Sequence, residues 1–107
     1  MNPTRIADDA LKTLKRDLDA SKFTPEEWAD VELAVNELAV VTAAVPVAEP
    51  AQLPGLKRRG LMARSILRNL SLAKAIEVEG AVLRAIDTAF RELLDVGLAS
   101  LRKILVG

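Results

Sequence analysis

A nearly unbroken apolar pattern covers residues 71–104. Within it, a row of residues recurs at seven-residue intervals: Ile76, Leu83, Phe90, Gly97 and Ile104. This spacing is typical of a helix that packs along one continuous seam. If residues 71–105 form one helix, it is about 52 Å long at 1.5 Å per residue, whereas a compact domain of this size has a radius of gyration of about 13 Å. The helix therefore either breaks and folds back or projects and pairs with other chains. We favour the second, because residues 96–106 have apolar residues on several faces and only Arg102 and Lys103 to solvate them.

The apolar surface of this helix is wide enough to need more than one neighbour. Val82, Ala89 and Val96 widen the seven-residue row along one side. Gly80 and Gly97 each cost a helix about 1 kcal/mol relative to alanine, so they mark a close contact, a kink or a helix end. The residues that we expect in the core of an oligomer are Ile76, Leu83, Ile86, Phe90, Leu93, Leu101 and Ile104.

Residues 1–45 predict an acidic helical hairpin, with 5 basic and 9 acidic side chains. A first helix is expected within residues 3–20, where apolar residues follow the 3.6-residue period of an amphipathic helix. A second helix is expected from residue 25 to about residue 44. The apolar stripe of the first helix consists of Ala7, Leu11, Leu14 and Leu18.

The strongest local signal in the sequence is the start of that second helix. Thr24 is expected to cap it, Pro25 to take the first helical position and Glu27 to complete a capping box. Phe23, which precedes the cap, can then pack against Trp28 as a hydrophobic staple. The acidic residues that crowd the first half of this helix lie where the helix dipole favours them.

Residues 46–55 carry a proline at every fourth position and form the predicted linker. Proline fixes φ and lacks an N–H donor, so we expect an extended, semi-rigid segment here and no helix. A short basic amphipathic helix is expected to follow from Leu56. The predicted class is thus all-α, packed in a bundle: an acidic N-terminal helical hairpin (1–45), a proline-rich linker (46–55), and a basic helix leading into a long C-terminal packing helix (56–107).

Residues 57–74 form a basic block with 6 basic and no acidic side chains. Its plainest partner is an acidic surface of its own chain or of a neighbouring chain. Nucleic acid is the alternative, with the chain acting as an adaptor that contacts phosphates, although no aromatic residues are interleaved for base stacking. An anionic membrane surface is less favoured, because the apolar side lacks Trp or Phe anchors. The charged contacts of the block are Lys57, Arg58, Arg59, Arg64, Arg68 and Lys74.

Few residues of this chain are suited to catalysis or metal binding, because it has no cysteine and no histidine. Their absence removes disulfides, thiolate nucleophiles, the usual general base and the commonest zinc ligand. The run from Ser71 to Lys74 matches the S-x-x-K pattern of penicillin-recognising acyl enzymes, but the companion elements of that pattern are missing. Ser71 has the simpler role of capping the long helix. We therefore predict no catalytic residue, metal site, cofactor or small-molecule substrate.

The N-terminus leads directly into a charged pattern, which is unlike a secretory signal. The longest uncharged run, residues 38–48, has 11 residues, whereas about 20 apolar residues are needed to cross a bilayer. We therefore expect a cytoplasmic protein, or one that assembles into a particle made in the cytoplasm.

The function expected from these features is non-enzymatic. The chain is expected to be a structural and interaction protein that self-associates through its long apolar C-terminal helix, or packs with other helical chains. A short helical chain with a linker and an overlong apolar helix is typical of small subunits of large assemblies, such as the components of a bacteriophage virion. This comparison rests on general features of the sequence and not on a motif, so it assigns no role to any residue.

Overall fold

The computed structural model describes the backbone of residues 2–106 and the side chains of residues 2–92. Residues 2–106 contain no strand, so the predicted all-α class is confirmed. Three short 3₁₀ turns lie between the first three α-helices. The α-helices are α1 (Pro3–Asp17), α2 (Pro25–Ala44), α3 (Leu53–Lys74) and α4 (Val78–Val106).

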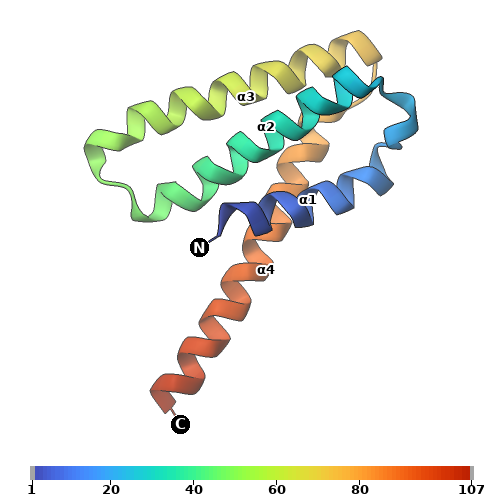
Figure 1. The fold of residues 1–107 in the computed structure, drawn as a ribbon. Coiled ribbons are helices and arrows are strands. Elements are labelled where there is room, and N and C mark those ends of the chain that lie inside the picture. Colours follow the sequence, from blue (N-terminus) through green and yellow to red (C-terminus); the bar gives the residue numbers. More distant parts are fainter. Residues whose placement is uncertain (1, 107) are drawn as a thin grey trace.

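The four helices pack around one apolar core. The helices α2 and α3 run antiparallel side by side, and α1 packs against α2 and against the first half of α4 (Figure 1). Buried side chains from all four helices belong to a single cluster, so the proline-rich segment connects two helices of one packed unit. The largest fully buried side chains are those of Ile6, Leu14, Val31, Val35, Leu67, Val78 and Val82.

The predicted start of α2 is confirmed. The Thr24 hydroxyl accepts a hydrogen bond from the Glu27 N–H at 3.1 Å, and the Glu27 carboxylate accepts one from the Thr24 N–H at 2.8 Å. Pro25 lies in the first turn of the helix. The rings of Phe23 and Trp28 meet edge to face, with centroids 5.6 Å apart. This capping box and its aromatic staple fix the direction in which the chain enters α2.

The proline-rich segment differs from the predicted extended linker. It forms two 3₁₀ turns, Val45–Val47 and Pro50–Gln52, and α3 begins at Leu53 rather than at Leu56. Each of the three prolines lies in the first turn of one of these elements. The first N–H groups of a helix have no intrahelical partner, so a missing proline N–H is no loss there. The three prolines, spaced by four residues, therefore each lie at the start of a helical element and do not prevent it from forming.

The boundary between α3 and α4 lies later than predicted, because the sequence pattern starts the long helix at residue 71 whereas α4 begins at Val78. The helix α3 continues to Lys74, and Ala75 then has a left-handed backbone conformation with φ of 56°. An alanine in this conformation costs roughly 1–2 kcal/mol, so the contacts around it must hold it in place. The break lies at neither glycine, because Gly80 and Gly97 both lie within α4.

The helix α4 is 29 residues long and projects from the bundle. Its first half lies against the other helices, and its second half extends beyond them (Figure 1). The Cα radius of gyration is 15.3 Å, larger than the value of about 13 Å for a compact domain of this length. Of the two predicted alternatives, the helix thus projects and does not fold back at Gly97.

Candidate interaction surface

The first half of α4 has two different apolar faces. One face is covered by the other helices, with Val82 0% and Ala89 3% exposed. The other face has Leu83 and Phe90, which are half-buried at the edge of the core. Leu83 and Phe90 belong to the predicted seven-residue row. That row is therefore the one that the chain's own helices leave partly uncovered.

Two residues of the predicted oligomer core lie away from the partly uncovered row of α4. Ile86 is only 4% exposed and packs in the core of its own chain, because it shares the buried face of α4. Ile76 precedes α4, since the helix begins at residue 78, so it is not part of a helical seam. Three further predicted residues lie in the second half of α4, outside the residues whose side chains are described: Leu93, Leu101 and Ile104.

A side chain from α3 fixes the start of α4. The Ser71 hydroxyl accepts hydrogen bonds from the N–H groups of Val78 and Glu79, both at 3.1 Å. The Glu77 carboxylate accepts a further one from the Gly80 N–H at 2.8 Å. Three N–H groups that a helix start leaves without an intrahelical partner are thereby satisfied. The predicted capping role of Ser71 is confirmed, although the serine acts from the end of the preceding helix.

Gly80 marks a close contact, one of the three meanings predicted for it. A Cβ atom added at this position would lie 2.9 Å from Oε1 of Glu77, closer than real Cβ atoms approach an oxygen. Because Glu77 is exposed and its carboxylate is the end of a flexible side chain, a larger residue at position 80 would shift that carboxylate.

Two arginines of the basic block fasten α3 to the first turn of α4. Arg64 Nη2 lies 3.0 Å from Glu79 Oε1, and Arg68 Nε lies 3.1 Å from Glu79 Oε2. The hydrogen bonds from Arg64 and Arg68 stabilise the carboxylate and hold the pKa of Glu79 below its ordinary value. The negative charge also lies at the N-terminal end of α4, where the helix dipole favours it. These contacts help to set the angle between the two helices.

Two further members of the block bind α2 and its cap. Arg59 forms a two-pronged ion pair with Glu37, with distances of 2.9 Å from Nε to Oε2 and 3.1 Å from Nη2 to Oε1. Lys74 Nζ lies 2.8 Å from Glu27 Oε1, and this hydrogen bond lowers the pKa of Glu27. The same ammonium group lies 5.3 Å from the centroid of the Phe23 ring. The block thus binds acidic residues of its own chain, as one of the predicted alternatives requires.

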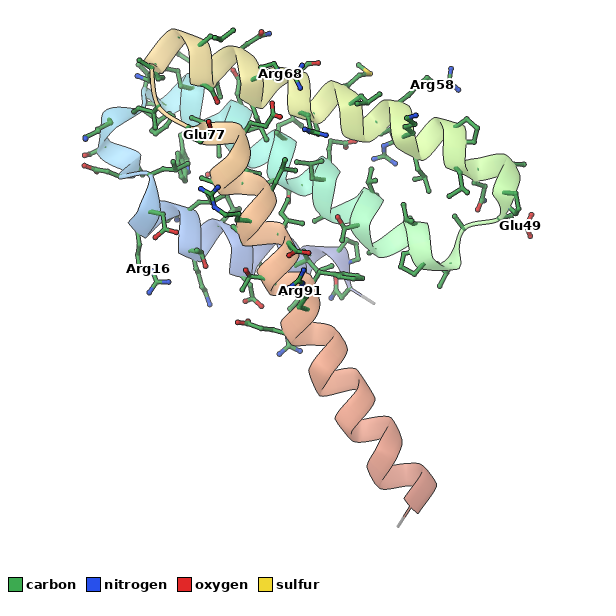
Figure 2. The ribbon with its side chains drawn as sticks, turned by 180° about the vertical axis from the view of Figure 1, so that it is seen from behind. Arg16, Glu49, Arg58, Arg68, Glu77 and Arg91 are labelled. Carbon is green, nitrogen blue, oxygen red and sulfur yellow. The ribbon has the colours of Figure 1, made fainter. Side chains whose placement is uncertain are left out.

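This pairing limits what the block can offer to an outside partner. Lys57 and Arg58 are exposed and make no ion pair within the part of the chain whose side chains are described. Arg58 points outward from α3 (Figure 2). Affinity for a polyanion rises with the number of phosphates neutralised. The nucleic-acid alternative therefore loses most of the free cations on which it depends.

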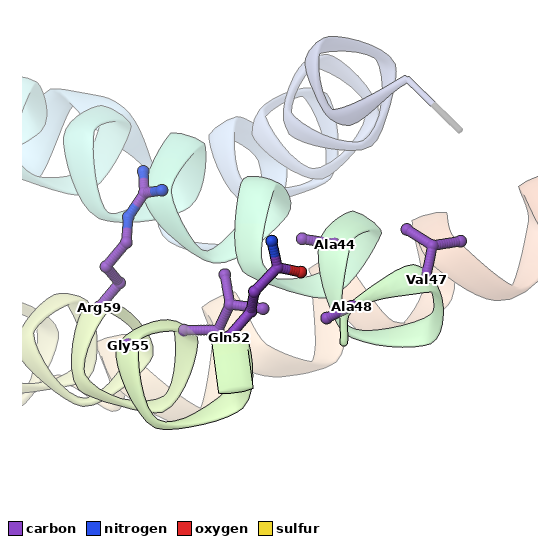
Figure 3. Close-up of a pocket in the computed structure, with 7 residues that line it drawn as sticks. Ala44, Val47, Ala48, Gln52, Gly55 and Arg59 are labelled. Atoms are coloured by element: carbon purple, nitrogen blue, oxygen red, sulfur yellow. The ribbon is translucent and has the colours of Figure 1, made fainter. Parts of the chain in front are cut away.

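The pair formed by α2 and α3 also carries three open apolar hollows, of which the largest, of about 680 Å³, lies beside Val41, Pro50 and Lys57. Arg59 lines the two others. One of these two has a volume of about 460 Å³ and is lined mainly by alanine, valine, leucine and glycine near the proline-rich segment (Figure 3). The other, of about 330 Å³, lies beside Leu33 and Met62. The guanidinium of Arg59 is engaged by Glu37. Such linings suit the apolar side chains of a partner better than a polar substrate, which needs several convergent polar groups.

Comparisons with family models, with curated proteins and with solved structures give no match to this chain. Within the described residues, no group of acidic side chains could hold a metal ion. A search of the described helices finds none that is both long and apolar enough to cross a membrane.

Proposed function

We propose that this chain is a non-enzymatic structural protein that self-associates through the second half of α4. The observation that carries the proposal is the projection of this helix. Beyond Arg91, the helix extends past α1, α2 and α3 (Figure 2), and its last 14 residues, 93–106, are called the projecting segment. The partner is a second copy of the same chain, which makes each chain a small subunit of a larger assembly formed in the cytoplasm.

The composition of the projecting segment supports this proposal. Nine of its 14 residues are apolar, and only Asp95, Arg102 and Lys103 are charged. An isolated helix of this length is marginal in water. Removing apolar surface from water contributes about 25 cal/mol per Å². A second copy that covers the segment would therefore stabilise both the helix and the assembly.

The phase of the apolar residues along α4 also supports a second chain. At 3.6 residues per turn, Leu94 and Leu101 share a face of the helix with Leu83 and Phe90 and not with Val82. These two leucines thus continue the face of Leu83 and Phe90, which the bundle leaves half-buried. A contact surface for another chain would follow the projecting segment along the side of the helix on which Phe90 lies.

The test is the solution mass of the full chain by light scattering after size exclusion, at low and high salt and over a tenfold concentration range. We expect a mass above 11.6 kDa in both salts, because the contact is apolar. Leu101→Asp should return the mass to that of one chain. Leu72→Asp is the matched control, because Leu72 is 77% exposed on α3, and it should leave the oligomer intact. A compact monomer at every concentration of the unaltered chain would refute the proposal.

A further inference from the structure

We propose, on the premise of this self-association, that the second copy packs antiparallel along the projecting half of α4. The seam of the contact consists of four leucines spaced by four, three and four residues. This spacing fills alternating a and d positions of a coiled-coil heptad, which share one face of a helix. Because α4 is helical to Val106, that register holds along the whole segment. The leucines are Leu94, Leu98, Leu101 and Leu105.

The charges beside this seam distinguish the two directions in which a second copy could run. Asp95 and Arg102 each follow a d-position leucine directly, so both occupy e positions on the same flank of the seam. In an antiparallel pair this flank faces the same flank of the other helix. Asp95 of each copy would then face Arg102 of the other, and the two-fold symmetry gives this pair twice.

A parallel pair offers no such match. There, an e position faces a g position of the other helix. The g positions of this seam are occupied by Gly97 and Ile104, which have no charge. A parallel arrangement would therefore leave Asp95 and Arg102 beside uncharged residues. Charge complementarity, together with the opposed dipoles of two antiparallel helices, favours the antiparallel pair.

The shape of the molecule also fits the antiparallel register. If Leu94 of one copy lies level with Leu105 of the other, and Leu98 with Leu101, residue 106 of each copy lies level with residue 93 of the other. The helix α4 leaves the other helices shortly after Arg91 (Figure 2). Each projecting helix would thus end where the bundle of the other copy begins, with the two bundles at opposite ends of the contact.

The absence of cysteine from the chain allows a direct test with the single variants Leu94→Cys and Leu105→Cys. In the proposed register, an oxidised mixture of the two variants forms disulfide dimers that contain one chain of each. Each variant alone forms none, because identical positions lie 11 residues, or about 16 Å, apart. A disulfide requires Cα atoms within about 7 Å. Tagging one variant identifies the mixed dimer by its mass.

The other outcomes of this experiment would overturn either the antiparallel arrangement or the self-association itself. If each variant cross-links with itself and the mixture gives only like pairs, the helices run parallel and the inference fails. If no cross-link forms while the mass stays above that of one chain, another surface holds the copies together; the inference then fails and self-association survives. If the unaltered chain is a monomer, the proposed function itself fails.

A charge-reversal series provides a second test. Asp95→Arg should raise the dissociation constant of the oligomer about tenfold, because it brings two arginines together in the antiparallel pair. The double variant with Arg102→Asp as well should restore the affinity, since the opposite charges then face each other again. Glu92→Arg is the matched control, because Glu92 is exposed and precedes the overlap, and it should change the constant little. If Asp95→Arg has no larger effect than this control, the proposed register is wrong.

Discussion

The two halves of α4 belong to one helix but direct their apolar residues differently. In residues 78–92, the buried face contains Val82 and Ala89 and is covered by helices of the same chain. Beyond Arg91, the helix extends past α1, α2 and α3 (Figure 2), and the four leucines of the proposed seam lie roughly 130° around the axis from Val82, toward the side of Phe90. A row of apolar residues at seven-residue intervals therefore does not by itself show whether the chain's own helices or a second chain cover it. The buried face and the row lie side by side on one helix, and the fold covers only the first.

The two halves of α4 should differ most in their response to a buried charge, which an aspartate substitution can introduce in either half. Val82→Asp should destabilise the bundle by about 3–5 kcal/mol, because it buries a carboxylate without a partner. Leu98→Asp should dissociate the oligomer and leave the unfolding midpoint of the bundle near that of the monomeric chain. Urea unfolding followed by circular dichroism measures both. The comparison breaks down if Leu98→Asp unfolds the chain as completely as Val82→Asp does.

A smaller effect, confined to the first half of α4, is expected from Ser71→Ala. Loss of the cap leaves the Glu79 N–H without its hydrogen-bond acceptor, whereas the Val78 N–H keeps its bond to the Ile76 carbonyl at 2.9 Å. The free energy of unfolding should therefore fall by about 1 kcal/mol. Ser65→Ala is the control, because the exposed Ser65 hydroxyl bonds only the Leu61 carbonyl of its own helix. Equal losses in the two variants would show that Ser71 has no special role. The oligomer mass should be unchanged in both.

The ion pairs of Glu79 should make the first half of α4 sensitive to acid. The pKa of Glu79 is lower in the folded chain than its ordinary value of 4.5. Its contribution is therefore fully present above about pH 4.5 and is lost as the pH falls through the lowered folded pKa. Glu79→Gln should be less stable by no more than about 1 kcal/mol at pH 7, because both arginines are partly exposed. Urea midpoints measured from pH 7 to pH 3 should converge for the two chains at low pH. A constant difference between them would contradict this assignment.

The smallest effect is expected from Arg59→Ala, which acts far from both halves of α4. Arg59 and Glu37 have side chains that are 47% and 38% exposed, so their ion pair should contribute less than about 0.5 kcal/mol. The free energies of unfolding of the unaltered chain and the variant should differ in low salt. In about 0.5 M salt, where the Debye length is only a few ångströms, that difference should vanish. A larger effect would mean that the hollows beside Arg59 are more important for the fold than the geometry indicates.

The sequence predicts the elements whose signals are local. The capping residues from Thr24 to Glu27 identify the start of α2, because each contact spans no more than three residues. The amphipathic period predicts α1. The arithmetic of helix length against domain size leaves two alternatives for the C-terminal helix, a break or a projection, and the apolar residues of the segment 96–106 favour the projection.

The sequence does not predict features that depend on contacts between distant positions. The break at Ala75 has no glycine or asparagine to mark it, since an alanine there is held in a left-handed conformation by its surroundings. Ser71 caps residues seven and eight positions later, a spacing that belongs to no capping motif. The division of α4 into a covered and a partly uncovered face depends on where α1 and α2 cross it. The intramolecular pairing of the basic block could be suggested from its acidic neighbours but not assigned to Glu37 and Glu79.

The left-handed residue at Ala75 has a consequence for the geometry of any assembly. The direction in which α4 leaves α3 is decided by this joint and by the capping contacts of residues 71–80. An assembly built through residues 93–106 takes the spacing and tilt of its subunits from that joint, which lies outside the contact itself. The strength of association and the architecture of the particle would thus be encoded in separate stretches of the chain. A change in the joint could re-aim the subunits while their affinity for one another stays the same.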